Sequence, residues 1–201
     1  MSTGTVQPVT YGLDASFPRF SVARYQRMIE AGILTTEDRV ELLENYVVLK
    51  MPGNPPHDGT IQAISKRVGR RLPAGWDYRV QSSIVLSDSQ PEPDIAVVRG
   101  NEVAYLSRHP TAADTGFVIE VADSSLLRDQ RDKTRIYARA GIPVYWIINL
   151  VDRRVEVYTQ PTGPVAVPAY GAFQTFQPGD SVPLVLDGTT AGSVPAADLL
   201  P

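Results

Sequence analysis

The stretch FVIEVADSSLLRDQRDKTRIYARAGIPVYWIINL, residues 117–150, decides the fold of this chain. It opens on one apolar run, FVIEVA, and closes on another, YWIINL. Between the two runs we expect a single helix from Leu126 to Ala140, which Gly141 and Pro143 would end. A strand, a helix and a second apolar strand in this order predict a βαβ unit, and therefore a sheet that is at least partly parallel.

Apolar runs on either side of this unit predict further strands. YRVQSSIVL (78–86) and DIAVV (94–98) come before it, and RVEVY (154–158) follows it. Nearer the N-terminus, RVELLENYVVLKM (39–51) predicts two strands joined by a tight turn at Glu44-Asn45, because Asn tolerates the left-handed backbone conformation.

Residues 57–72 show the spacing of a helix. The apolar side chains fall three or four residues apart and form one stripe, made of Ile61, Ile64, Val68 and Leu72. Basic residues take the other sides of the helix, namely Lys66, Arg67, Arg70 and Arg71. They form either a solvated helix face, which we favour, or a patch that faces phosphates. Strands and helices together predict an α/β fold: a mixed central β-sheet flanked by helices, with the site at one sheet edge.

Composition excludes several kinds of functional site. The sequence has no Cys and only two His among its 201 residues. A disulfide framework, a cysteine-ligated zinc site and a thiol nucleophile are therefore excluded, and histidine-rich metal sites are disfavoured. The formal net charge of -3 means that any binding of nucleic acid must use a local patch.

The sequence shows no signal for export or membrane insertion. The first residues contain no basic start followed by an apolar run, and no stretch approaches the roughly 18 apolar residues of a membrane span. We therefore expect a cytoplasmic protein with no membrane partner.

Two acidic residues stand out because of their apolar neighbours. Asp94 opens a strand directly after Pro93, and Glu120 lies inside the run FVIEVA. A carboxylate in such a run is costly unless it is paired or binds a metal. With Lys133 from the following helix, the acids suit hydrolysis of a phosphodiester, in which Mg²⁺ takes oxygen ligands and a water attacks phosphorus. From the residue types alone, a structural ion pair is the favoured alternative.

Longer motifs support the catalytic reading. They are DRVELLEN (38–45), QPEPDIAVV (90–98), RHPTAAD (108–114) and the block that runs from 119 to 150, followed by RRVEVY (153–158). In their order and spacing the sequence resembles the bacterial family of putative restriction endonucleases, a branch of the PD-(D/E)XK nuclease superfamily. The resemblance implies a PD-(D/E)XK nuclease-like domain over 21–160. From their composition, residues 1–20 form a loose lead-in and residues 161–201 a Pro/Gly-rich β extension of the same domain.

The resemblance also implies roles for individual residues. Asp94 corresponds to the aspartate of the superfamily's PD motif and Glu120 to its second acid, and both would bind the metal together with the backbone carbonyl of Val121. The superfamily's usual lysine would stand at position 122, which is Ala122 here. Lys133 matches the helical lysine that this family uses instead, so the implied catalytic residues are Asp94, Glu120 and Lys133.

Three further residues are candidates for supporting roles. Glu41 matches an acid that would help to hold the metal. Gln81 would either bond to water or phosphate or, as we favour, be a plain strand residue. Asp129 lies one turn before Lys133 and would either orient the lysine or form an ordinary surface pair with it. A structural role is favoured for the remaining matches: His57, His109, the turn or cap residues Asp123, Ser124 and Ser125, and the packing residues Tyr137, Tyr145 and Trp146.

Two functional hypotheses follow. The first is a Mg²⁺-dependent endonuclease, with Mn²⁺ able to substitute, that hydrolyses DNA or another phosphodiester by a metal-activated water. The second is a catalytically silent binding or assembly protein that keeps the nuclease fold. A decayed site usually loses an acid or the lysine, so the presence of all three residues favours the enzyme. We also expect a homodimer, because symmetric dimers are the commonest oligomers.

Overall fold

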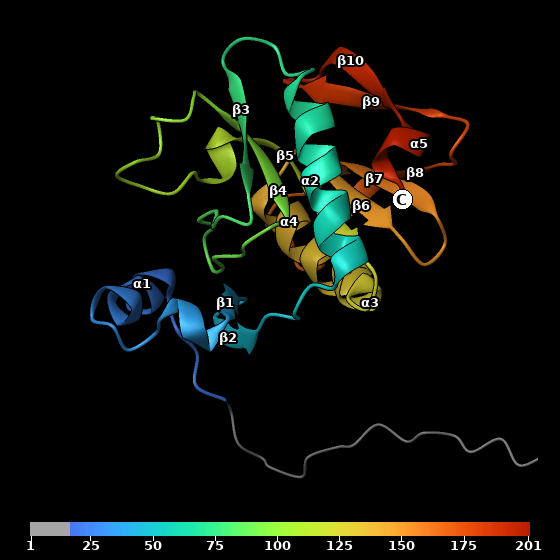
Figure 1. The fold of residues 1–201 in the computed structure, drawn as a ribbon. Helices are drawn as coiled ribbons and strands as arrows, with labels where there is room; N and C mark the ends of the chain where they lie inside the picture. Colours follow the sequence, from blue (N-terminus) through green and yellow to red (C-terminus); the bar gives the residue numbers. More distant parts are fainter. Residues whose placement is uncertain (1–16) are drawn as a thin grey trace, which may run out of the picture.

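A six-stranded mixed sheet forms the centre of the molecule (Figure 1). The structure, a computed structural model, describes residues 17–201. In order across the sheet, its strands are β3 (Trp76–Val80), β4 (Ile95–Arg99), β5 (Thr115–Ala122), β6 (Val144–Asn149), β7 (Arg154–Pro161) and β8 (Tyr170–Phe176). Strands β5 and β6 are parallel and every other neighbouring pair is antiparallel. The predicted mixed α/β sheet is confirmed.

The βαβ unit of the sequence lies at the middle of this sheet. All residues of β5 and β6 are buried, as continuous apolar runs covered on both faces should be. Their parallel register pairs Glu120 with Ile147, and Ile147 in turn pairs with Glu156 on β7. Side chains of laterally paired residues point to the same face of a sheet. Glu120 and Glu156 therefore lie on one face, two strands apart.

The opposite face is covered by α2 (Pro55–Gly69), together with the hairpin of β9 (Ser181–Leu186) and β10 (Thr189–Pro195) and the short α5 (Ala196–Leu199). In Figure 1, α2 crosses in front of the sheet and the hairpin lies beside its upper end. Ile61, Ile64 and Val68 of the predicted stripe are buried there against β4, β5 and β6. The helix begins two residues earlier than the spacing predicts, because Asn54 caps it and Pro55 suits its first position.

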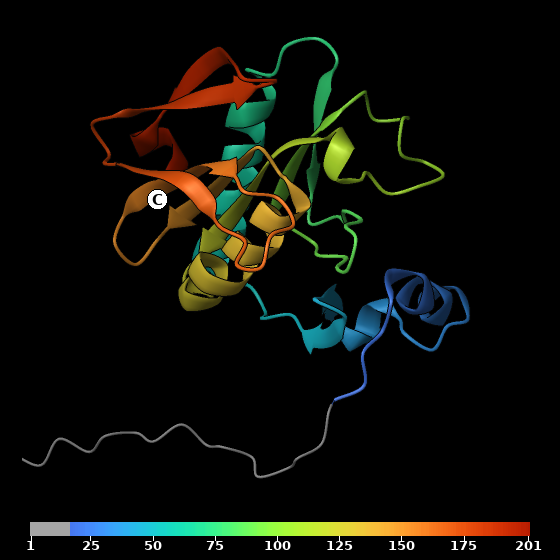
Figure 2. The ribbon, with the colours of Figure 1, turned by 180° about the vertical axis from the view of Figure 1, so that it is seen from behind.

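The face that carries Glu120 is covered by the segment from 126 to 140 (Figure 2). This segment is not the single α-helix that the sequence predicts. It consists of α3 (Leu126–Arg128), a π-helical segment η3 (Asp129–Lys133) and α4 (Thr134–Ala140), which Gly141 ends in the left-handed conformation. The sequence pattern does not distinguish α from π winding, because both bury a continuous apolar face.

An N-terminal unit packs beyond the end of the sheet where α2 begins (Figures 1 and 2). It contains α1 (Val22–Glu30), the short η1 (Thr36–Asp38) and the hairpin of β1 (Val40–Leu43) and β2 (Tyr46–Leu49). Glu44 and Asn45 have positive φ angles of 49° and 68°, so the predicted tight turn is confirmed. Most of the expected lead-in, residues 1–20, falls outside the described residues.

The prediction of a strand over 78–86 is wrong for its second half. β3 ends at Val80, and Gln81 has a φ angle of 44°, which no continuing strand allows. In the loop that follows, Ile84 and Leu86 are buried on the face of the sheet that the segment from 126 to 140 covers. Their burial explains the apolar pattern without a strand. Within residues 17–201, no helix is long and apolar enough to span a membrane.

Candidate active site

The candidate site is a pocket of about 550 Å³ between the N-terminal unit and one end of the sheet. Its walls come from α1, β1, the start of α2, the loop that leads into β4, the end of β5, and the π-helical segment η3. Every side chain that the sequence singled out for catalysis or support lines this pocket: Glu41, Gln81, Asp94, Glu120, Asp129 and Lys133. The fold thus gathers residues that are up to 92 positions apart in the chain.

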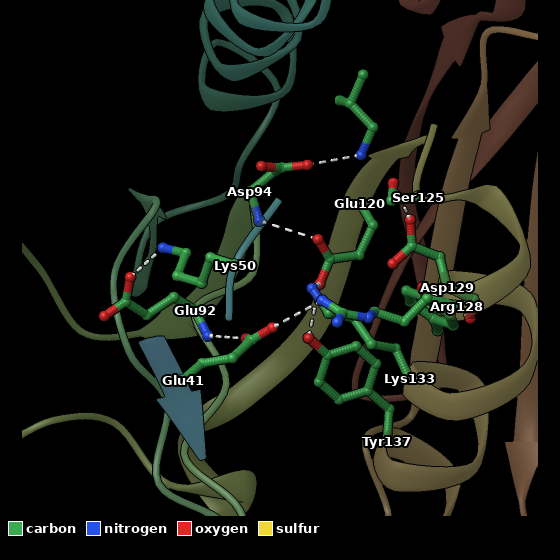
Figure 3. Close-up of polar contacts among 12 residues, drawn as sticks. Glu41, Lys50, Glu92, Asp94, Glu120, Ser125, Arg128, Asp129, Lys133 and Tyr137 are labelled. Atoms are coloured by element: carbon green, nitrogen blue, oxygen red, sulfur yellow. Dashed lines mark hydrogen bonds and ion pairs between the residues drawn. The ribbon is translucent and has the colours of Figure 1, made fainter. Parts of the chain in front are cut away.

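Glu120 and Lys133 form a buried ion pair (Figure 3). The Lys133 Nζ lies 2.7 Å from Glu120 Oε1, which also accepts a 2.8 Å hydrogen bond from the Tyr137 hydroxyl. The other oxygen, Oε2, has only a long contact of 3.4 Å from the Asp94 backbone N–H. Ala122, where the superfamily's usual lysine would stand, is fully buried on the same face. The ammonium therefore reaches Glu120 from the helix and not from the strand.

Asp94 lies beside Glu120, but its carboxylate is directed elsewhere (Figure 3). Asp94 Oδ2 accepts a 2.8 Å hydrogen bond from the Val121 N–H, and His57 Nε2 lies 3.3 Å from the same oxygen. The contact with Asp94 raises the pKa of His57 to about 9, against the opposing effect of burial. Among residues 17–201, no three acidic or histidine side chains are arranged so that they hold one metal ion.

Glu41, on β1, is the third acid of the pocket and is only 2% exposed. Its Oε2 accepts a 3.2 Å hydrogen bond from the Glu92 N–H, and its Oε1 lies 4.0 Å from Arg128 Nη1. Lys50 forms an ion pair with Glu92 at the same wall of the pocket. The N-terminal hairpin therefore adds the Glu41 carboxylate to the site, and Lys50, directly after the hairpin, adds one cation to the wall of the pocket.

Asp129 is buried at the start of η3, so the surface pair considered for it is wrong. Its carboxylate accepts a 2.6 Å hydrogen bond from the Ser125 hydroxyl. Across the described chain, its carboxylate makes no hydrogen bond or ion pair with Lys133. The π-helical winding changes the spacing on which the i, i+4 expectation rests.

The pocket carries more buried carboxylates than cations. Burial raises the pKa of Glu120 to about 8; Lys133 opposes the rise, and Asp94 and Asp129 add to it. Burial likewise raises the pKa of Asp129, again opposed by Lys133. Burial alone would lower the pKa of Lys133, but the surrounding carboxylates, with Glu120 the strongest, raise it above its ordinary value. The lysine is therefore a fixed cation, and the acids around it are under-neutralised.

The remaining candidates lie in the pocket wall or on the helices and turns next to it. Gln81 is exposed just beyond the end of β3, where its N–H donates to the Asp94 carbonyl, so it is not the strand residue that we favoured. His57 and His109 both line the pocket. Ser125 stands at the N-cap position of α3, and Asp123 accepts a hydrogen bond from Asn54 at the start of α2. On α2, Arg67 donates to the Asp198 carbonyl and so is bound to the C-terminal helix.

From the sequence, one contact of Tyr137 was not predicted, and Glu156 was not identified at all. Tyr137 packs in the core as expected, and its hydroxyl also binds Glu120. Glu156 went unremarked, although it stands between Val155 and Val157 as Glu120 stands in its own apolar run. The same argument from buried acids would have found it.

Comparisons with known proteins agree with this architecture. The family model Uma2, described as "Putative restriction endonuclease", matches residues 22–191. A crystal structure described as a putative nuclease belonging to DUF820, from Anabaena variabilis, has a similar fold, with a TM-score of 0.68 at 15% sequence identity over 90% of this chain and 97% of that one. No protein with a curated description matches the sequence. The match over most of the chain places this protein in the Uma2 family of putative restriction endonucleases.

Proposed function

We propose that this protein is a Mg²⁺-dependent endonuclease that hydrolyses phosphodiester bonds of DNA, with Mn²⁺ able to replace Mg²⁺. One observation carries the proposal: Asp94, Glu120 and Lys133 meet in a single pocket where buried carboxylates outnumber cations. Membership of a restriction endonuclease family supports the same reading. DNA is the substrate that this family's description implies.

The donor atoms of the pocket fit a hard divalent cation. Mg²⁺ prefers oxygen ligands, and Asp94, Glu120 and Glu41 all offer carboxylates here. Glu120 Oε2 has only its long contact and is the oxygen best placed to accept a ligand. The Val121 N–H points to Asp94, and in an extended strand the carbonyl of the same residue points to the same side. The proposed ligands are therefore Asp94, Glu120 and the Val121 carbonyl, with Glu41 in support.

The chain's own groups have separate tasks in this proposal. A bound divalent cation would supply Lewis-acid chemistry, stabilising negative charge on a phosphate and making a water more acidic. Lys133 holds a positive charge beside Glu120 that offsets the charge developing on the phosphate. Asp94 Oδ2 accepts from the Val121 N–H and lies near His57, so Oδ1 is the oxygen of Asp94 that is left for a ligand. Tyr137 and the helix keep Lys133 and Glu120 in contact.

A protein that binds or assembles without turnover is the second candidate. It is favoured by the direction of the carboxylates, since Glu120 is paired with Lys133 and Asp94 with the backbone. In that case the acids and the lysine would stabilise the fold only. Cleavage measurements separate the two candidates.

The test is nicking of supercoiled plasmid DNA by the purified protein, with Mg²⁺, with Mn²⁺ and with a chelator. Wild type should nick in either metal and not with the chelator. Asp94→Asn should lower the rate by about 10²-fold or more, as loss of a group in the electrostatic machinery does. Asp187→Asn makes the same chemical change on an exposed turn outside the pocket. It is the matched control and should cut like wild type. Wild type that binds DNA and nicks it in no metal would establish the non-catalytic candidate.

We also propose a homodimer, formed through the C-terminal edge of the sheet. β8 is an edge strand that exposes Phe173, and the loop before it exposes Val165 and Val167. Edge strands with exposed apolar side chains favour pairing with another chain. Light scattering should give twice the mass of 22.0 kDa, and a mass of one chain at all concentrations would contradict the proposal.

A further inference from the structure

The π-helical segment η3 is held from the sheet side by three consecutive strands. Lys133 binds Glu120 on β5, and the Asp129 carbonyl accepts a 3.3 Å hydrogen bond from the Tyr145 hydroxyl on β6. The Gln130 amide donates to both oxygens of Glu156 on β7, at 3.0 and 2.9 Å. Both ends of this five-residue segment are thus tied to buried acids, one at the candidate site and one outside it.

A π-helical turn needs such support. Its wide winding is rare in proteins, occurs mostly as a single turn inside an α-helix, and is frequent at functional sites. Here the Asp129 carbonyl accepts from the Thr134 N–H, five residues on, and from the Thr134 hydroxyl at 2.8 Å. A reversion to α winding would turn every later side chain about the helix axis. Lys133 is the last residue of the segment, so the winding sets where its ammonium points.

Glu156 is a buried carboxylate that accepts hydrogen bonds from several elements. It is fully buried, and besides Gln130 its carboxylate accepts from Asn149 at 2.8 Å, from Arg154 at 2.9 and 3.0 Å, and from Tyr158 at 3.0 Å. Within the described chain it has no place in the pocket wall. Asn149 belongs to β6, and Arg154 and Tyr158 belong to β7. Only Gln130 comes from outside the sheet, because it belongs to η3.

We propose that Glu156 and Gln130 are positioning residues for Lys133: their hydrogen bonds fix the π-helical winding of η3 and thereby hold the Lys133 ammonium on Glu120. Glu156 and Gln130 act on Lys133 through the side chains of η3, without contacting the substrate. This inference rests on the proposed function for its catalytic meaning. Its structural part, the placement of Lys133, is independent of any cleavage.

The structural part is testable by lysine labelling without metal or DNA. The only lysines of the sequence are Lys50, Lys66 and Lys133, so reductive methylation followed by peptide mass spectrometry resolves each one. Lys133 is buried and should react slowly, whereas Lys66 is exposed and serves as the internal reference. Gln130→Met keeps the length of the side chain and removes the donor. Labelling of Lys133 relative to Lys66 should rise about tenfold, because losing a hydrogen bond to a charged group shifts local opening by that order.

Tyr158→Phe is the matched control. It also removes one hydrogen bond from Glu156 but leaves η3 tied to the sheet. A merely structural role would make the two variants alike: similar melting temperatures and unchanged labelling of Lys133. The proposal expects a rise in labelling, and an approximately tenfold slower plasmid nicking, for Gln130→Met alone.

The outcomes separate this inference from the proposed function. Unchanged labelling of Lys133 in folded Gln130→Met overturns the positioning role whatever the cleavage assay shows. Increased labelling in a protein whose wild type does not nick DNA keeps the positioning role and contradicts the endonuclease. If Gln130→Met does not fold, Gln130→Ala, which removes the donor at a half-buried position and suits a helix, replaces it. Slow labelling of Lys133 in that folded variant would likewise overturn the inference.

Discussion

Glu120 and Glu156 lie in the same row of the sheet, on the same face, about 10 Å apart across the intervening β6, yet they have opposite surroundings. Glu156 is surrounded by donors, and although burial raises its pKa, the hydrogen bonds from Asn149, Gln130 and Arg154 lower it below its ordinary value. Glu120 has few donors and several acidic neighbours, and its pKa rises to about 8.

The difference shows how one kind of residue in one kind of strand serves two purposes. A buried carboxylate whose oxygens are all occupied by donors favours its charge and stabilises the fold. A buried carboxylate with an under-occupied oxygen, next to other acids, favours an added cation. Glu156 has the first environment and Glu120 the second. Four predictions test this contrast, from the largest expected effect to the smallest.

The conservative Glu→Gln change should separate the two acids most strongly. Glu120→Gln removes a proposed metal ligand and should slow plasmid nicking by about 10²-fold or more. Its melting temperature should fall less than that of Glu156→Gln, because burial beside other acids already disfavours the charged form of Glu120 and raises its pKa. Glu156→Gln should melt at a clearly lower temperature and, below that temperature, slow nicking by no more than about tenfold, because Glu156 acts on the site only through Gln130. Equal losses of activity in both variants would remove the contrast.

Lys133 should matter for cleavage more than for stability. Lys133→Met keeps the chain length without the charge, and we expect nicking to fall by about 10²-fold because one electrostatic group is lost. Lys133→Arg should not restore full activity, since a planar guanidinium has a different shape. Lys66→Met, on the exposed side of α2, is the control and should cut at the wild-type rate. A Lys133→Met protein as active as wild type would reduce this lysine to an ion-pair partner.

The two acids should give stability opposite dependences on pH, measured by urea unfolding with a chelator present. Between pH 4.5 and about 8, folded Glu120 holds a proton that the unfolded chain has released, so its contribution to the free energy of unfolding falls as pH rises. Glu156 contributes stability above its unfolded pKa and loses it as pH falls through its lower folded pKa. Glu120→Gln should abolish the loss on alkalinisation. Glu156→Gln should weaken the loss on acidification, and unchanged pH profiles in both would contradict the contrast.

A matched pair of tyrosines should give the smallest effects. The Tyr137 hydroxyl binds Glu120 and the Tyr158 hydroxyl binds Glu156, at 2.8 and 3.0 Å. Tyr137→Phe should lower the nicking rate by about fivefold, the equivalent of one hydrogen bond. Tyr158→Phe should lower the free energy of unfolding by about 1 kcal/mol and leave nicking unchanged. The reverse pattern would mean that the two networks have been assigned the wrong roles.

The sequence predicts those features that depend on apolar pattern and on special residues. The βαβ unit, the turn at Glu44-Asn45 and the end of α4 at Gly141 follow from the residues themselves. The loop after Gln81 was misassigned because a buried apolar run reports burial and not hydrogen-bond partners. Its N–H groups bond to scattered carbonyls, such as those of Pro91 and Ser89, which no local pattern reveals.

Motif positions named six side chains that line one pocket, but they did not predict the contacts among them. They did not show that Asp94 bonds to the backbone of Val121, or that Asp129 is separated from Lys133 by a π-helical turn. Both depend on tertiary packing, because the winding of η3 is supported by Glu156, which lies 26 residues from Gln130 in the chain.

Calorimetric titration of the metal-free protein with Mn²⁺ tests the central claim most directly. Wild type and Glu156→Gln should bind the ion at the site, whereas Asp94→Asn and Glu120→Gln should lose that binding, because Asp94 and Glu120 are proposed ligands and Glu156 is not. Mn²⁺ binding that is unchanged in both Asp94→Asn and Glu120→Gln would contradict the claim and make Glu120, like Glu156, an acid of the fold.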